Sequence, residues 1–231
     1  MEIKCELRRL RDKSCGPDEL PPWIFRSLSF AFSSALTFVF NKSVSSGIIP
    51  SSFKIANVVP IPKCKNPSGF DQFRPISLLP VLSKVLERLI CRKLILPHVK
   101  PLLGTNQFAY IPDTGSGTTT ALTLTSLYVL KLLDSSSGAV RIITIDFSRA
   151  FDKARHDVIL STAKNFQFPK FLLRRIFSFL SDRFQRVLWQ GRYSGWSPIR
   201  SGVPQGSVLG PVLFLVFSLT VLIVCVQILK S

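Results

Sequence analysis

The sequence predicts an α+β fold, because segments with the periodicity of strands and segments with the periodicity of helices alternate along its 231 residues. Residues 55–62 form a β-branched apolar run bounded by prolines, which predicts a short strand. The apolar run 140–145 predicts a second strand. Two more strands are expected over 185–189 and 192–197, as a hairpin that turns near Gly191.

Helices are predicted where apolar residues recur along one face. The clearest is 80–96, whose apolar side chains are three and four residues apart and whose Lys and Arg residues fall mostly outside that face. A packed helix is expected over 20–40, because its apolar run is too short to span a bilayer, and 41–50 is expected to be turn-like. Helices are also predicted over 121–133 and 169–180. No repeat of fixed period is present, so one domain with a discordant tail is expected.

The charge balance predicts a polyanionic partner. The chain has 30 Lys and Arg residues against 13 Asp and Glu residues, a net charge of +17, and 46% hydrophobic residues. This composition is too apolar for a disordered basic tail, and it favours nucleic acid or an anionic membrane surface as the partner. The five cysteines include no Cys-x-x-Cys pair, which argues against a zinc ribbon and a disulfide framework. We therefore expect an intracellular protein, nuclear or cytoplasmic and not secreted, since the charged segment 1–15 does not look like a secretory signal.

Two short stretches could carry chemistry. Asp146 follows the predicted strand 140–145, and a carboxylate in that position could bind a hard divalent cation or, with about equal weight, cap a helix or form a salt bridge. The stretch 201–211 holds three glycines and two prolines, a composition that suits close approach of a ligand to the backbone and also suits a plain tight turn. The histidines stand in no metal motif, and His156 is interpreted as a helix-start residue.

Together with 61–63 and 73–79, these stretches resemble the reverse transcriptase domain of non-LTR, LINE-like retrotransposons. The resemblance covers 16–217, which divides the chain into a basic segment 1–15, the reverse transcriptase domain 16–217 and a divergent hydrophobic tail 218–231. Further matching pieces are Gly16-Pro17-Asp18, Lys84-Val85-Leu86-Glu87-Arg88, Asn106-Gln107-Phe108-Ala109-Tyr110 and the block 146–156. Several ordered motifs in one chain are more specific than any single motif.

The resemblance implies a right-hand polymerase fold, here with fingers, a partial palm and no thumb. It implies an enzyme that copies an RNA or DNA template into DNA from a primer and deoxynucleoside triphosphates, using Mg²⁺ or Mn²⁺. By the family's pattern, Asp146 is the catalytic, metal-binding carboxylate, and the backbone carbonyl of Phe147 lies beside it. Asp152 has no metal role in this pattern, and a salt bridge or a cap is expected for it.

The same pattern assigns nucleotide-binding residues. Lys63 and Arg74 would meet the triphosphate, although either could be an ordinary solvated cation. Phe151 would be a steric gate against a ribose 2′ hydroxyl, with a core phenylalanine as the alternative. Gln205 and Gly206 would lie against the nucleotide and template.

The pattern breaks after Phe217. No Asp or Glu follows Asp182, so the family's aromatic-Ala-Asp-Asp motif, which supplies the other metal-binding carboxylate, is missing from this sequence. We therefore expect a truncated or frame-shifted copy with weak metal binding and little or no polymerase activity. A non-catalytic, basic nucleic-acid-binding remnant is one alternative. The apolar run 212–229, of marginal length for a bilayer, leaves a tail-anchored membrane protein as another.

Overall fold

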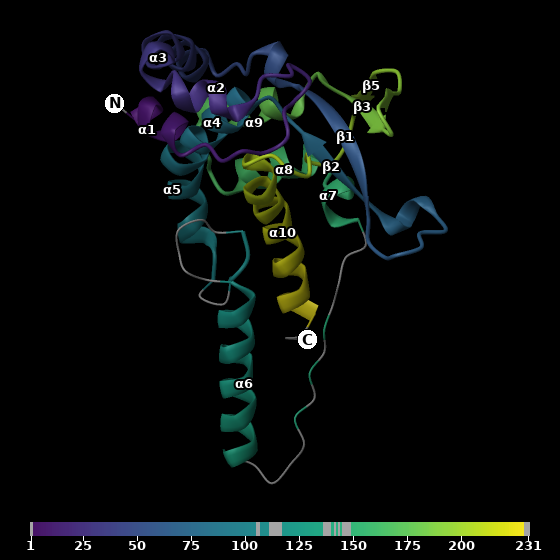
Figure 1. The fold of residues 1–231 in the computed structure, drawn as a ribbon. Coiled ribbons are helices and arrows are strands. Elements are labelled where there is room, and N and C mark those ends of the chain that lie inside the picture. Colours follow the sequence, from purple (N-terminus) through teal and green to yellow (C-terminus); the bar gives the residue numbers. More distant parts are fainter. Residues whose placement is uncertain are drawn as a thin grey trace.

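The computed structural model describes residues 2–104, 107–110, 117–135, 140, 142, 144 and 149–228. Helices and a sheet form a compact head, from which one long helix, α6, extends away (Figure 1). The α-helices are α1 (Glu2–Arg8), α2 (Pro22–Ser27), α3 (Ser29–Ser46), α4 (Val81–Ile90), α5 (Leu96–Val99), α6 (Thr118–Ser135), α7 (Ala150–Lys153), α8 (His156–Asn165), α9 (Lys170–Leu180) and α10 (Leu209–Ile228). Short 3₁₀ turns lie at Ser51–Phe53, Phe70–Gln72 and Lys100–Leu102, and a π-helical turn, Cys91–Ile95, joins α4 to α5.

The strands form a mixed sheet in the order β2-β1-β3-β4, with β5 also paired to β3. Its strands are β1 (Ile55–Pro62), β2 (Phe73–Leu78), β3 (Arg183–Trp189), β4 (Arg192–Tyr193) and β5 (Ser197–Ile199). β1 pairs antiparallel with β2 and parallel with β3, although β1 and β3 are far apart in the sequence. The predicted mixture of helices and strands is therefore confirmed, and β1 has the predicted bounds.

The predicted hairpin is present between β3 and β4. Trp189 pairs with Arg192, and the two residues between them, Gln190 and Gly191, have φ values of 47° and 75°. Two successive positive φ angles are typical of the tight turn whose twist matches antiparallel strands. A glycine is needed here, because few other residues adopt this backbone conformation without strain.

Two sequence predictions are corrected. The turn expected over 41–50 begins later, because α3 continues to Ser46 and ends at Gly47, whose left-handed φ of 72° provides the helix C-cap. The strand expected over 140–145 is not formed at the positions that the structure describes: Val140, Ile142 and Thr144 lie in no strand.

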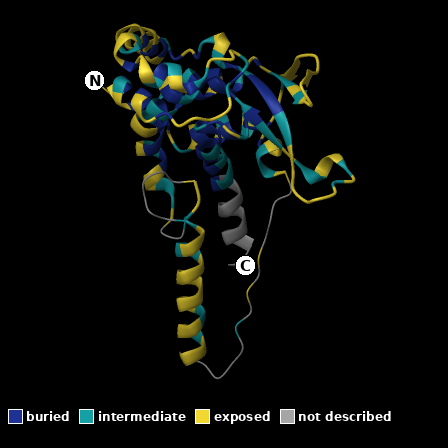
Figure 2. Cartoon of the chain, in the orientation of Figure 1, coloured by how far each residue is buried: buried dark blue, intermediate teal, exposed yellow. Residues whose placement is uncertain are grey.

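The core lies among the helices of the head (Figure 2). α4 contributes Val81, Val85, Leu86 and Ile90, the face predicted from its periodicity, and α9 contributes Leu172, Ile176 and Leu180. The N-terminal segment adds Ile3, Leu7 and Leu10 to the same cluster, so it is a packed part of the head as well as a basic segment. In contrast, the side chains of α6 are largely exposed (Figure 2).

α10 places part of the apolar run 212–229 inside this core. Val212, Leu213 and Val216 are buried and contact the other core residues, which accounts for their apolar character. The boundary expected at 217/218 falls within this one helix. In the portion of the chain that the structure describes, no helix is both long enough and apolar enough to cross a membrane.

Arg175 of α9 is a buried cation with incomplete hydrogen bonding. Its side chain is 0% exposed, its Nη2 donates to the Val44 carbonyl, and its Nε and Nη1 have no partner within the described residues. Burial lowers the pKa of Arg175, because loss of contact with water disfavours its charged form.

We expect Arg175→Met to leave the free energy of unfolding unchanged or to raise it by about 1–2 kcal/mol, because methionine keeps the bulk and removes the desolvated charge. Urea denaturation measures this, and Arg174→Met, at an exposed position next to it, is the matched control with an expected change below about 0.5 kcal/mol. A loss of stability in Arg175→Met, beyond that of the control, would contradict the expectation.

Candidate functional site

An open cleft of about 810 Å³ lies between the β1–β2 pair, β3 and the loop 201–208. Its polar lining includes Lys63, Arg74, Arg149, Asp152 and Gln205. Val58, Val187 and Trp189 are among the residues of its apolar wall. Segments that are more than a hundred residues apart in the sequence therefore meet around one cavity.

Lys63 and Arg74 are brought to this cleft by the pairing of β1 with β2. Arg74 lies opposite Ile61 in the register, and Lys63 follows the end of β1, where its backbone N–H donates to Gln72 O at 2.8 Å. The Lys63 ammonium donates to Asp71 O at 2.8 Å, and both cationic side chains are exposed. The β1–β2 pair therefore presents two positive charges to the cleft, an arrangement suited to an anionic ligand.

Gln205 reaches the cleft from the opposite side. Its Nε2 donates to Asp152 Oδ1 at 3.0 Å, and its backbone carbonyl accepts the Ser77 N–H at 2.6 Å. The second bond ties the loop to β2, and the first ties it to α7. Among the described residues, the partner of the Asp152 carboxylate is therefore the Gln205 amide, where the sequence predicted a salt bridge or a cap.

Gly206 has a conformation that only glycine adopts readily, with a φ of 120°. A Cβ atom built on it would lie 2.6 Å from the Ser77 carbonyl oxygen. Close packing of loop 201–208 against β2 is therefore sufficient to explain this glycine. The role in which Gly206 admits a nucleotide or template stays a prediction.

Phe151 does not line the cleft, although its neighbour Asp152 does. Its ring stacks on Phe214 at a centroid distance of 4.8 Å and meets Tyr110 edge-on at 5.6 Å. The Phe151 carbonyl accepts the Val203 N–H at 2.9 Å, which holds α7 to the start of the loop. This packing agrees with the alternative of a core phenylalanine, and the steric-gate role stays a prediction.

Asp146 and Phe147 lie outside the described residues, so the predicted metal site has no described geometry. Within the described ranges, no group of three or more His, Cys, Asp or Glu side chains could hold a metal ion. His156 begins α8, as predicted, and its Nε2 lies 2.8 Å from Gly202 O, to which the ring N–H donates. This histidine therefore positions the loop.

Sequence reasoning missed Glu87, which is only 2% exposed on α4. Its Oε2 accepts the N–H groups of Val208 at 2.7 Å and Leu209 at 3.2 Å, and its Oε1 accepts Ser83 Oγ–H at 2.8 Å. A carboxylate at the first N–H groups of a long helix satisfies unpaired donors and interacts favourably with the helix dipole. Glu87 therefore fixes the point where loop 201–208 becomes α10. The sequence held one signal for this role: two polar residues, Ser83 and Glu87, lie four residues apart among the apolar positions of α4.

The family model described as reverse transcriptase (RNA-dependent DNA polymerase) matches residues 61–223. The chain belongs to this family, and it is a reverse transcriptase domain of the non-LTR retrotransposon type.

Relatives support this assignment. The chain is 35% identical over 208 residues to the RNA-directed DNA polymerase from mobile element jockey of Drosophila melanogaster, with 89% of this chain and 22% of the relative covered. It is 33% identical over 220 residues to the jockey polymerase of Drosophila funebris, with 94% of this chain and 24% of the relative covered. The match to the probable RNA-directed DNA polymerase from transposon BS of Drosophila melanogaster is 32% over 208 residues, with 89% of this chain and 22% of the relative covered. The chain thus spans less than a quarter of the length of these relatives.

Proposed function

We propose that residues 16–217 form the fingers and partial palm of a right-hand polymerase, flanked by the basic segment 1–15 and the divergent tail 218–231. The cleft beside Lys63, Arg74 and Gln205 takes the incoming deoxynucleoside triphosphate. The observation that carries this proposal is that these three residues, singled out from separate sequence motifs, line one cavity.

The chemistry of the cleft fits such a ligand. Lys63 and Arg74 supply positive charge for the triphosphate, and the Arg74 guanidinium can offer paired donors to phosphate oxygens. Trp189 and the apolar wall provide a surface for the sugar and base. Gln205 lies on the loop that faces them, with Gly206 next to it toward the template.

The remaining assignments belong to the same proposal. Asp146, with the Phe147 carbonyl, would hold Mg²⁺ or Mn²⁺, and the ion would supply positive charge for the attacking and leaving oxygens. The family resemblance also assigns Phe151 to the exclusion of ribonucleotides, and this role would require its ring to turn from Phe214 toward the cleft. The macromolecular partner is an RNA or DNA template with its primer.

Binding of a fluorescent deoxynucleoside triphosphate to the chain, in the presence of Mg²⁺, tests the cleft without requiring catalysis. We expect Arg74→Gln and Lys63→Gln each to raise the dissociation constant about tenfold, since each removes a charged contact to phosphate worth roughly 1.4 kcal/mol. The matched control is Lys42→Gln, the same change at an exposed position on α3 away from the cleft. Equal affinity in all four proteins would overturn the assignment of this cleft.

A further inference from the structure

β3 carries an arginine, Arg186, that is oriented by its neighbours. Its guanidinium carbon lies over two aromatic rings, 3.8 Å from the ring centroid of Tyr193 and 4.6 Å from that of Trp196. Its Nε donates to Asn57 Oδ1 at 2.9 Å. Cation–π contacts and this hydrogen bond restrict the side chain before any ligand binds. The two Nη groups bond to none of the described residues and reach solvent, so they are available to a partner.

Strand geometry separates Arg186 from the nucleotide cleft. Val187 and Trp189 line that cleft, and successive side chains of a strand alternate between its two faces, so Arg186 lies on the opposite face. Leu188 shares this face, and Tyr193, which lies opposite Leu188 in the β3–β4 pairing, shares it too. β3 and β5 are on the side of the head away from α1 (Figure 1). A partner could therefore bind here while the nucleotide cleft stays open.

Exposed aromatic side chains surround this arginine. Phe184, Tyr193 and Trp196 are 42%, 46% and 44% exposed, and Phe184 lies on the same face of β3 as Arg186. Phe184, Arg186, Leu188, Tyr193 and Trp196 are called the Arg186 surface below. Trp, Tyr and Arg are the residues that most often dominate the binding energy of protein interfaces. An arginine that is already held in place also loses less side-chain entropy on binding. The Arg186 surface therefore has the composition and the order of a protein-binding site.

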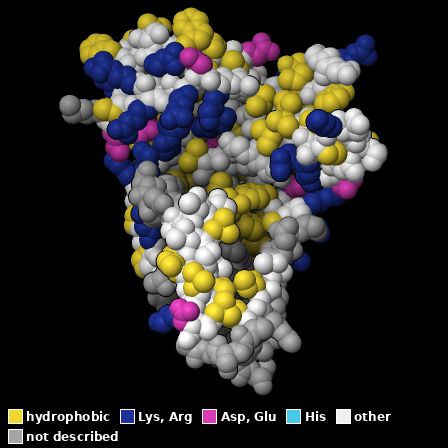
Figure 3. All heavy atoms as spheres, turned by 60° about the horizontal axis from the view of Figure 1, so that its bottom comes forward, with side chains coloured by type: hydrophobic (Ala, Val, Ile, Leu, Met, Phe, Trp, Pro, Cys, Tyr) yellow, Lys and Arg dark blue, Asp and Glu magenta, His cyan; other side chains and the backbone are white. Residues whose placement is uncertain are grey.

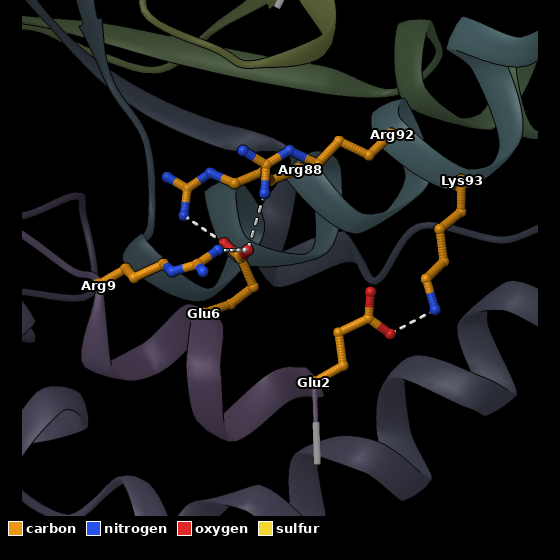
Figure 4. A network of polar contacts seen from close by, with 6 residues as sticks. All are labelled: Glu2, Glu6, Arg9, Arg88, Arg92 and Lys93. Carbon is orange, nitrogen blue, oxygen red and sulfur yellow. Dashed lines mark hydrogen bonds and ion pairs between the residues drawn. The ribbon is translucent and has the colours of Figure 1, made fainter. Parts of the chain in front are cut away.

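The charge of this region is complementary to a carboxylate. The segment 183–200 contains four arginines and no Asp or Glu. Elsewhere the chain binds arginines with its own acid: Arg88 and Arg92 bind the Glu6 carboxylate at 2.7 Å and 2.9 Å (Figure 4). Arg186, in contrast, forms no ion pair with any described residue. Lys and Arg side chains are also more frequent than Asp and Glu side chains on the face of the molecule that Figure 3 shows, so an acidic partner is attracted at longer range.

We propose that the Arg186 surface binds a protein segment in which one Asp or Glu side chain stands next to an apolar side chain. The carboxylate accepts paired hydrogen bonds from the Arg186 Nη groups, and the apolar side chain packs on Phe184 and Leu188. One oriented guanidinium with apolar neighbours matches a single carboxylate. It matches a sugar-phosphate backbone less well, because such a backbone repeats its charge at every nucleotide. The proposal does not depend on the assignment of the nucleotide cleft.

The test is fluorescence anisotropy of the full chain with two short labelled peptides, one with a central Glu between two Leu residues and one with Gln in place of that Glu. We expect the Gln peptide to bind about tenfold more weakly. Arg186→Lys should raise the dissociation constant of the Glu peptide about tenfold, because lysine keeps the charge but loses the planar pair of donors. Arg192→Lys is the matched control, since Arg192 lies opposite Trp189 on the other face of the same hairpin, and its dissociation constant should stay within about twofold.

A second variant, Trp196→Ala, keeps the test valid if Arg186→Lys does not fold. Trp196 is exposed and lies between β4 and β5, and its loss removes one of the rings that hold Arg186, so we expect about fivefold weaker binding of the Glu peptide. Equal affinity for the Glu and Gln peptides, or binding of neither, would overturn the proposal. Equal losses in Arg186→Lys and Arg192→Lys would overturn the location of the site. Binding of a labelled single-stranded RNA through Arg186, without binding of the Glu peptide, would show that the partner is not a protein.

Discussion

Replacing Glu87 by alanine is expected to lower the free energy of unfolding by about 3 kcal/mol and to loosen loop 201–208. The carboxylate is buried and accepts three hydrogen bonds, from Val208 N–H, Leu209 N–H and Ser83 Oγ–H. Alanine would leave the Val208 and Leu209 N–H groups without their acceptor, whereas Ser83 Oγ–H could still donate to Phe53 O. It would also leave a space where the carboxylate was.

Arg183 adds a second contribution to the loss of stability in Glu87→Ala. This residue is 1% exposed at the start of β3. Burial lowers the pKa of Arg183, and the negative charge of Glu87 acts in the opposite direction. The folded state therefore holds Arg183 charged with help from Glu87. Loss of Glu87 removes that help and adds to the cost of the buried guanidinium.

Urea denaturation of Glu87→Ala measures the loss of free energy of unfolding. The stability of Glu87→Gln should lie between that of Glu87→Ala and that of the unmodified chain, because its amide oxygen can still accept from the helix N–H groups. Asp134→Ala, at an exposed acidic residue of α6, is the control for removal of a carboxylate, with an expected change below about 0.5 kcal/mol. A Glu87→Ala protein as stable as this control would contradict the capping role.

The contrast between α4 and its partners shows what the sequence could predict. The apolar face of α4 follows from spacing within one helix, so Val81, Val85 and Ile90 were predicted correctly. The partners of Glu87 and Glu6 lie 121 and 82 residues away, at Val208 and Arg88. Local periodicity carries no information about such contacts, which depend on how the helices pack.

The candidate site likewise combines residues that the sequence indicated with contacts that it did not indicate. Lys63, Arg74 and Gln205 were selected through the family resemblance, and the pairing of β1 with β2 and the Ser77–Gln205 hydrogen bond bring them to one cleft. Gly206 was selected through the same resemblance, and its glycine-rich stretch suited either close approach of a ligand or a tight turn. The sequence did not indicate that the close neighbour of Gly206 is the backbone of β2, because that neighbour belongs to a distant strand.

Gly206→Ala is therefore expected to lower the free energy of unfolding by about 3 kcal/mol and to weaken nucleotide binding about tenfold. An alanine at this φ of 120° is strained, and its Cβ would lie 2.6 Å from the Ser77 carbonyl oxygen. The loop must move away from β2 to relieve the contact. That movement stretches the 2.6 Å bond between Ser77 N–H and Gln205 O and withdraws the Gln205 side chain from the cleft.

Gly195→Ala is the matched control, because no atom lies within 4 Å of a Cβ built on Gly195 and its backbone is not in the left-handed region. Urea denaturation and titration of a fluorescent deoxynucleotide on the two variants distinguish the two explanations of Gly206. If this glycine serves only to admit a ligand, Gly206→Ala will bind nucleotide weakly and unfold at the same urea concentration as Gly195→Ala. If it serves to dock the loop on β2, both properties fall together, because the contact that positions Gln205 is the same contact that stabilises the fold.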